Sequence, residues 1–146
     1  MARTRAGLGT AIALCAVLAL AGCGDDQVGD LTADPIASTT PAGGELVASR
    51  EEEAHGGGLL GKPSPVKVLR TYAFESEAAA QRALTELQVA AEDAGWDISS
   101  VAPDESGFSA ARPLDGRRAT LSVALNLDPA FPPAPGVFVS LSSSGD

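Results

Sequence analysis

An alternating stretch near the C-terminus constrains the fold of this chain more than any other feature. Over residues 119–127, apolar residues and small or polar residues take turns. Because side chains of a strand point alternately to the two faces of a sheet, this pattern predicts a strand that is buried on one side. The apolar members are Ala119, Leu121, Val123, Leu125 and Leu127. The opposite face is expected to meet water, and it would carry Thr120, Ser122, Asn126, Ser140 and Ser142.

Four further strands and one helix complete the predicted domain. The strands are expected over residues 66–74, 96–101, 108–112 and 137–142, where β-branched and aromatic residues are frequent. Between the first two, a single apolar stripe at spacings of three and four predicts a helix. The stripe consists of Ala80, Leu84, Leu87, Ala91 and Ala94.

Three local signals support this order of elements. Ser76 is expected to cap the helix, and Gly95 to follow its last turn. The Asp115–Gly116 pair predicts a tight hairpin, since both residues tolerate left-handed backbone. The fold is therefore predicted to be α+β: a two-layer sandwich of an antiparallel sheet of four or five strands with one helix on one face.

The first 23 residues have the pattern of an export signal. Arg3 and Arg5 precede an apolar run over residues 8–20, which is shorter than the roughly 20 residues that span a bilayer. The run ends in Leu20-Ala21-Gly22-Cys23. This order of an aliphatic residue, a small residue, Gly or Ala, and then Cys resembles the lipobox of bacterial lipoproteins. The resemblance covers residues 1–23 only and implies nothing about the remaining domain.

This resemblance implies a covalent modification and a location. Cleavage would fall between Gly22 and Cys23, and the Cys23 sulfur would carry a diacylglyceryl group with fatty acyl chains such as palmitate. A third chain on the new α-amine is left open. Two acyl chains hold a protein stably on a bilayer, whereas one chain binds only marginally. The protein is therefore expected at the extracytoplasmic face of the cell membrane, anchored by lipid.

Charge and cysteine content narrow the classes of partner. The chain has 19 acidic and 10 basic residues, and removal of residues 1–22 would leave 8 basic residues and a formal charge of −11. Such a charge argues against a nucleic-acid partner. Both cysteines, Cys15 and Cys23, lie in the signal region, so the rest of the chain has no disulfide.

The composition predicts three segments: a signal peptide over residues 1–22, a lipid anchor with a disordered acidic tether over 23–61, and a small α/β domain over 62–146. Residues 24–61 contain no aromatic side chain and many acids and glycines. As a flexible coil of 38 residues, they would reach roughly 35 Å. Within this tether, residues 45–55 favour a short helix, which would place Glu51 and His55 on one face as a weak metal pair, and Leu59 and Leu60 are compatible with packing against the domain.

No residue is expected to catalyse a reaction or to hold a metal or a cofactor. The only histidine lies on the predicted tether, and Ser109 lacks the second glycine of a nucleophile elbow. The adjacent acids Asp104–Glu105 and Glu92–Asp93 are typical of a turn and of a solvated helix end. Arg117–Arg118 is compatible with an anion site, but also with plain soluble surface. Trp96 is expected in the core rather than in a binding site.

The predicted function is that of a non-enzymatic lipoprotein, an envelope or interaction module. Its partners would be the membrane, through the covalent lipid, and an envelope protein; the oligomeric state is left open. The alternative is a carrier or sensor that binds a small apolar ligand between the helix and the sheet. The many alanines of the helix and the proline-rich loop near Phe131 favour that alternative. A hydrolase with paired carboxylates is least favoured, because no acid lies on a predicted inward face.

Overall fold

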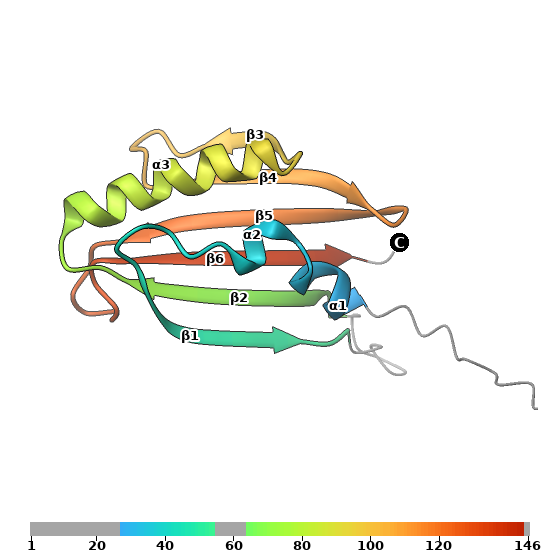
Figure 1. Cartoon of the computed structure of the whole chain (residues 1–146), viewed down its shortest axis with the longest axis horizontal. Coiled ribbons are helices and arrows are strands. Elements are labelled where there is room, and N and C mark those ends of the chain that lie inside the picture. The colour runs from blue at the N-terminus through green and yellow to red at the C-terminus, as the bar shows by residue number, and fades with distance from the viewer. Residues whose placement is uncertain (1–26, 55–63, 145–146) are drawn as a thin grey trace, which may run out of the picture.

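The computed structural model of the chain describes residues 27–54 and 64–144 (Figure 1). The export signal with Gly22 and Cys23, and His55, lie outside the described residues. The helices are α1 (Gln27–Thr32), α2 (Pro35–Ser38) and α3 (Glu77–Asp93). The strands are β1 (Glu45–Glu52), β2 (Val66–Ala73), β3 (Asp97–Val101), β4 (Gly107–Leu114), β5 (Arg117–Asn126) and β6 (Gly136–Ser144).

The strands form one antiparallel sheet in the order β1-β2-β6-β5-β4-β3. The predicted antiparallel sheet is confirmed. The predicted number of four or five strands was wrong, because the described residues form six. The one predicted helix is joined by α1 and α2, and in Figure 1 all three lie over the same face of the sheet. Strands β2 and β3, which α3 connects, run in the same direction with β6, β5 and β4 between them, so the connection through α3 crosses over the sheet.

The core lies between this face and the helices. One row of paired residues crosses four strands, and every member is fully buried: Val68, Leu141, Leu121 and Ala110. Leu87 and Ala91 of α3 belong to the same cluster and are also fully buried. Small alanine side chains on α3 allow its backbone to approach the sheet closely, as the predicted stripe required.

The predicted helix boundaries agree with the structure. The Ser76 hydroxyl accepts a hydrogen bond from the Ala79 amide (3.2 Å) and so caps α3. Gly95 follows the helix at φ 81°, a left-handed conformation that favours glycine. The turn between β4 and β5 has φ 47° at Asp115 and φ 78° at Gly116, the signs of the predicted tight hairpin.

Two details of the strands differ from the prediction. Leu127 was expected to face inward, but β5 ends at Asn126 and Leu127 is 42% exposed at the start of the proline-rich loop. The Asn126 side-chain amide donates to the Pro133 carbonyl (2.9 Å), which holds that loop against the strand. The last strand was predicted to end at residue 142, but β6 continues to Ser144, and Ser143 is buried between its partners Ala119 and Val66.

Strand β1 replaces the short helix that residues 45–55 were expected to favour. It pairs with β2 from Glu45 opposite Ala73 to Glu52 opposite Lys67, with a bulge at Val47. Nearly all its side chains are exposed, so it is held by backbone hydrogen bonds to its neighbour rather than by burial. Because neither face of β1 is buried, its sequence has no alternation of apolar and polar residues from which a strand could be predicted.

Helices α1 and α2 also lie in the segment that was predicted to be a disordered tether. The prediction of disorder was wrong for residues 27–52, since Leu31, Ile36 and Ala37 are buried in the common core. The Tyr72 hydroxyl on β2 donates to the Thr39 carbonyl (2.9 Å) just after α2. Burial raises the pKa of Tyr72 above its usual value, although the nearby Arg70 charge acts in the opposite direction. The ordered fold therefore includes this segment.

Truncation of a core residue in this segment tests its place in the fold. Ile36 is 1% exposed, so Ile36→Ala is expected to lower the free energy of unfolding by about 2–5 kcal/mol, measured by urea denaturation. The matched control is Val47→Ala in the same segment, where the side chain is 48% exposed and a change within about 0.5 kcal/mol is expected. Equal, small effects of both substitutions would show that the segment is not part of the core.

Candidate functional site

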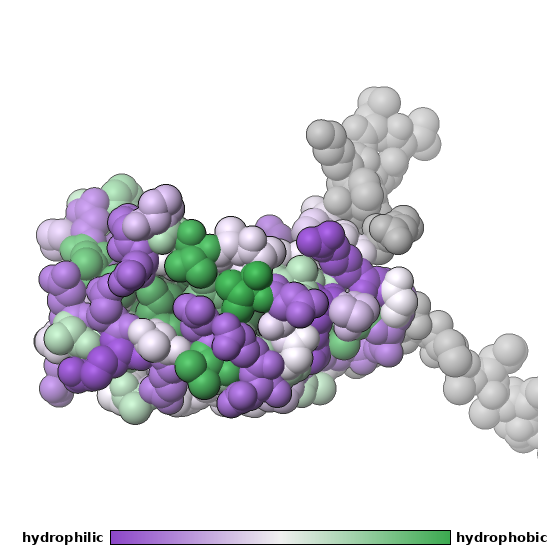
Figure 2. Space-filling view, turned by 90° about the horizontal axis from the view of Figure 1, so that it is seen from above, coloured by the Kyte–Doolittle hydropathy of each residue, from purple (hydrophilic) through white to green (hydrophobic). Residues whose placement is uncertain are grey.

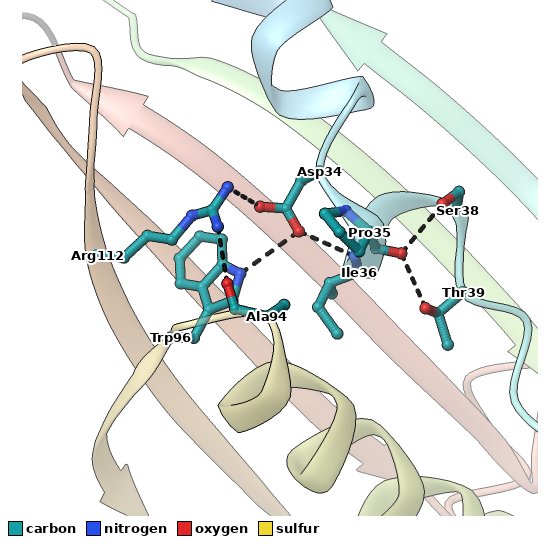
Figure 3. Close-up of polar contacts among 8 residues, drawn as sticks. All are labelled: Asp34, Pro35, Ile36, Ser38, Thr39, Ala94, Trp96 and Arg112. Atoms are coloured by element: carbon teal, nitrogen blue, oxygen red, sulfur yellow. Dashed lines mark hydrogen bonds and ion pairs between the residues drawn. The ribbon is translucent and has the colours of Figure 1, made fainter.

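A buried polar cluster of Asp34, Trp96 and Arg112, which we call the Asp34 clasp, joins three distant parts of the chain (Figure 3). The Asp34 side chain is completely buried, and its Oδ2 forms an ion pair with the Arg112 guanidinium. Its Oδ1 accepts hydrogen bonds from the Ile36 amide (2.9 Å) and from Trp96 Nε1 (3.4 Å). The first of these bonds makes Asp34 the N-cap of α2.

Arg112 connects this carboxylate to the end of α3. Its Nη1 donates to the Ala94 carbonyl (2.9 Å), one of the carbonyls that a helix C-terminus leaves without an intrahelical partner. Its guanidinium carbon lies 4.9 Å from the centroid of the Trp96 ring, which is a cation–π distance. The remaining nitrogen, Nε, is buried without a hydrogen-bond partner in the part of the chain that the structure describes.

The clasp is arranged to hold the fold rather than to transform a substrate. Its charged atoms point at one another, and the Asp34 carboxylate has no exposed surface on which to meet a ligand. Removing one partner of such a pair is costly, because the other charge stays in a medium that solvates it poorly. The clasp therefore ties α2 to β4 and to the end of α3, and it fixes the positions of these three elements relative to one another.

A groove of about 510 Å³ lies beside the clasp, at the edge of β4. Strand β3 begins only at Asp97, opposite Ala111, so residues 112–114 have no β3 partner. Proline suits such an edge because it has no amide hydrogen to donate, and Pro113 lies there. We call this the hairpin groove, and it is lined by Asp97, Ile98, Ser99, Ala111, Arg112, Pro113, Gly116, Arg117 and Arg118.

The hairpin groove contains three arginines and one acid. Arg117 and Arg118, which the sequence marked as compatible with an anion site, are joined there by Arg112. No pattern along the chain groups Arg112 with that pair. The β4–β5 pairing brings Arg112 opposite Ala119, the residue after Arg118. The side chains of the predicted pair belong to opposite faces of the sheet: Arg117 has the parity of the buried Ala119, whereas Arg118 lies opposite Pro113 and is exposed.

A second opening lies between α3 and the β3–β4 end of the sheet. It has a volume of about 280 Å³ and is lined on the helix by Leu84 and Gln88, and on the sheet side by Val101, Glu105 and Phe108, among others. Small-molecule sites are commonly about 300–1,000 Å³ and mostly apolar, so this opening is at the lower limit of size. Seen from the α3 and β3 side, the surface mixes hydrophobic and hydrophilic residues (Figure 2). In the part of the chain that the structure describes, a carrier could therefore use this small opening, but the core between α3 and the sheet is closely packed.

The other candidate residues are not brought together. Asp104 and Glu105 form an exposed turn, where hydrogen bonds from the Ser106 hydroxyl and amide hold the pKa of Asp104 below its usual value. Glu92 and Asp93 are exposed at the end of α3.

The predicted metal pair does not form a described site either. Glu51 forms an ion pair with Arg70 (3.0 Å), and its expected partner His55 lies outside the described residues. Ser109 lies within β4, opposite Ser122. Among residues 27–54 and 64–144 there is no group of three or more His, Cys, Asp or Glu side chains that would suit a metal ion.

Trp96 is buried, as expected, but its two clasp partners were missed. One local signal for Asp34 was present: an Asp followed by Pro is typical of an N-cap and the first helical position, and Asp34–Pro35 begins α2 in this way. No local signal marks Arg112, whose partner lies 78 positions earlier in the chain.

Comparison with protein-family models, with curated proteins and with solved structures finds no match for this chain. Among the described residues, no helix has the length and apolar character needed to cross a membrane. The functional argument therefore depends on the residues themselves.

Breaking the clasp tests how much it contributes to the free energy of unfolding. Asp34→Ala leaves the Arg112 charge unpaired and is expected to lower the free energy of unfolding by about 3–5 kcal/mol. The double variant Asp34→Ala/Arg112→Met removes both charges, so it is expected to be less destabilised than the sum of the two single variants, as measured by urea denaturation. Glu51→Ala, which breaks the more exposed pair with Arg70, serves as the control and is expected to cost about 0–1 kcal/mol. Strictly additive effects would show that Asp34 and Arg112 do not act as a pair.

Proposed function

We propose that this protein is a membrane-anchored extracytoplasmic lipoprotein whose domain is a non-enzymatic interaction module. The observation that carries the proposal is the sequence Leu20-Ala21-Gly22-Cys23 at the end of a short apolar run. It matches the lipobox pattern at every position and provides a thiol for the lipid. The acyl chains on Cys23 would hold the acidic domain at a membrane whose surface repels it.

The beginning of the described fold supports a short connection to the membrane. Gln27, the first residue of α1, follows Cys23 by four positions. A chain of four residues spans at most about 14 Å, whereas the tether expected from composition would reach roughly 35 Å. A lipid on Cys23 would therefore keep the domain close to the head groups, with the α1 end toward the bilayer.

This attachment divides the sheet into a proximal and a distal end. Helix α1, which begins at Gln27, lies at the end of the sheet where β1, β4 and β6 finish and where β2 and β5 begin, on the right in Figure 1. We call this the proximal end. The distal end is the opposite one, where β1, β4 and β6 start and where β2, β3 and β5 finish.

Exposed hydrophobic side chains gather at the distal end. Of the seven large hydrophobic residues that are exposed in the described ranges, six lie in the elements and the loop of that end. They are Leu46, Val47, Val101, Leu127, Phe131 and Phe138. Phe131 is the most exposed of them at 69%, on the loop between β5 and β6. Exposed apolar residues concentrated at one end are typical of a surface that binds another protein, so we propose an envelope protein as the partner.

The anchor is tested by metabolic labelling. Cells grown with a clickable fatty acid are expected to label the native chain, and Cys23→Ala is expected to abolish the label because the thioether can no longer form. Cys15→Ala is the matched control, since Cys15 lies within the segment that would be removed, and it should retain the label. Label that persists in Cys23→Ala would overturn the lipid anchor.

The interaction surface is tested by photo-crosslinking in cells. A photoreactive phenylalanine at position 131 is expected to give a discrete adduct with one envelope protein. The same group at position 89, where Val89 is 52% exposed on α3 away from the distal end, is the control and is expected to give none. Equal adducts at both positions, or none at position 131, would contradict a distal binding surface.

A further inference from the structure

We propose that the distal end binds a protein segment in which Lys or Arg side chains flank apolar ones, and that the acids around Phe131 select for this positive charge. The inference rests on the proposed function, because it names the chemistry of the partner that the distal end was proposed to bind. The occupant is therefore a basic and partly apolar surface of an envelope protein, and neither a membrane nor a second copy of this chain.

The loops of the distal end carry acidic residues and no basic ones. We call residues 39–45, 74–77, 102–106 and 127–135 the distal loops, and they lie on the left in Figure 1. Within them lie six acids, all of them exposed: Glu45, Glu75, Glu77, Asp104, Glu105 and Asp128. All seven Lys and Arg residues of the described ranges lie outside the distal loops. A surface with one sign of charge attracts and steers a partner of the opposite sign.

Neighbouring bases do not neutralise these acids. No ion pair among the described residues includes an acid of the distal loops. Of the bases within five positions of a distal loop, Arg50 pairs with Glu52, and Arg70 pairs with Glu51. The third, Arg82, lies in the second turn of α3 and is exposed. The negative charge of the distal loops is therefore available to a partner.

Contacts between the distal loops place acids on both sides of the proline-rich loop. Strands β5 and β6 are the central pair of the sheet, so the loop over residues 127–135 lies in the middle of this end. On one side, the Phe74 amide donates to the Pro135 carbonyl (3.1 Å), and the residue after Phe74 is an acid. On the other side, the Leu125 amide donates to the Ser106 carbonyl (2.7 Å), and two acids precede Ser106.

The loop that presents Phe131 is held in shape before a partner arrives. The Asn126 side-chain amide donates to the Pro133 carbonyl (2.9 Å), and the Asp128 carboxylate accepts a hydrogen bond from the Ala130 amide (2.9 Å). Phe131 lies between these contacts and is 69% exposed. An aromatic side chain on a loop of fixed shape is typical of the centre of a protein interface, and charged residues are typical of its rim.

The same charges oppose other occupants of this end. A second copy of the chain would bring six more acids against the first six, and facing like charges weaken association. An anionic membrane surface would repel the distal loops in the same way. A basic segment instead gains attraction at the rim while its apolar side chains cover Phe131.

Photo-crosslinking of two hexapeptides to the complete acylated chain in phosphatidylcholine nanodiscs tests the proposal. The chain carries a photoreactive phenylalanine at position 131, and the peptides alternate Leu with Lys or Leu with Glu. We expect an adduct with the Leu–Lys peptide, detected as an increase in intact mass, and none with the Leu–Glu peptide. The yield is expected to fall between about 0.05 M and about 0.5 M NaCl, because salt screens exposed charges.

Two double variants with the same change of net charge separate local from overall attraction. Glu75→Gln/Glu105→Gln removes two charges from the distal loops. It is expected to lower the yield of the Leu–Lys adduct at least about twofold, since one exposed ion pair contributes about 1.4-fold to fivefold in affinity. The control Glu92→Gln/Asp93→Asn removes two charges from exposed positions at the other end of α3 and is expected to leave the yield unchanged.

The outcomes distinguish the chemistry of the partner from the proposed function. Equal adducts with both peptides, no adduct with either, or equal yields in the two double variants would overturn the selection for positive charge. In cells, the same photoreactive group reports whether an envelope protein binds at all. An adduct in cells whose crosslinked segment lacks Lys and Arg would overturn this inference and leave the proposed function standing. The absence of any adduct in cells would count against the proposed function, and the peptide yields would then decide the charge preference of the distal end alone.

Discussion

The ion pair between Asp34 and Arg112 is the contact on which the arrangement of the whole chain depends. It joins a residue near the start of the described fold to β4, the strand next to the edge strand β3, and it is completed by Trp96 and by the end of α3. A carboxylate with no exposed surface is tolerable only because a guanidinium and two hydrogen-bond donors solvate it. Loss of any of these partners would affect α2, β4 and the helix end together, since each takes part in the same small cluster.

Burial and backbone pairing stabilise different parts of the sheet. The central strands β2, β6, β5 and β4 share a fully buried row of side chains, so the hydrophobic effect holds them to the helices. Strand β1 has almost no buried surface and depends on its hydrogen bonds to β2, with the Arg70–Glu51 pair beside them. The fold therefore has a well-packed centre and one weakly held edge, and that edge is formed by the segment that leads away from the proposed anchor.

Sequence patterns predicted the parts of the fold that carry their own signal. The alternation in β5, the cap at Ser76, and the turn at Asp115–Gly116 each depend on neighbouring residues, and each was located correctly. Helix α2 and strand β1 depend on partners that lie far away in the chain, so composition alone suggested disorder. The clasp was missed for the same reason: Trp96 looked like an ordinary core residue, and only the folded chain brings Arg112 against its ring. The pair Arg117–Arg118 was visible as a charge signal, but the groove beside it is lined by residues of β3 and β4 that only the folded sheet brings near the hairpin.

The separation of the proximal and distal ends has a mechanical consequence. A partner bound at Phe131 and a lipid on Cys23 would pull on the domain from opposite ends of the strands. Such a force acts parallel to the strands, whereas the hydrogen bonds between antiparallel strands lie perpendicular to them. The hydrogen bonds between two neighbouring strands would then bear the force all at once, in shear, and would not break one after another. The sheet would thus transmit tension between the membrane and the partner. The packing of α1 on β2 and β6, followed by the Asp34 clasp, would be the first contacts to bear that force.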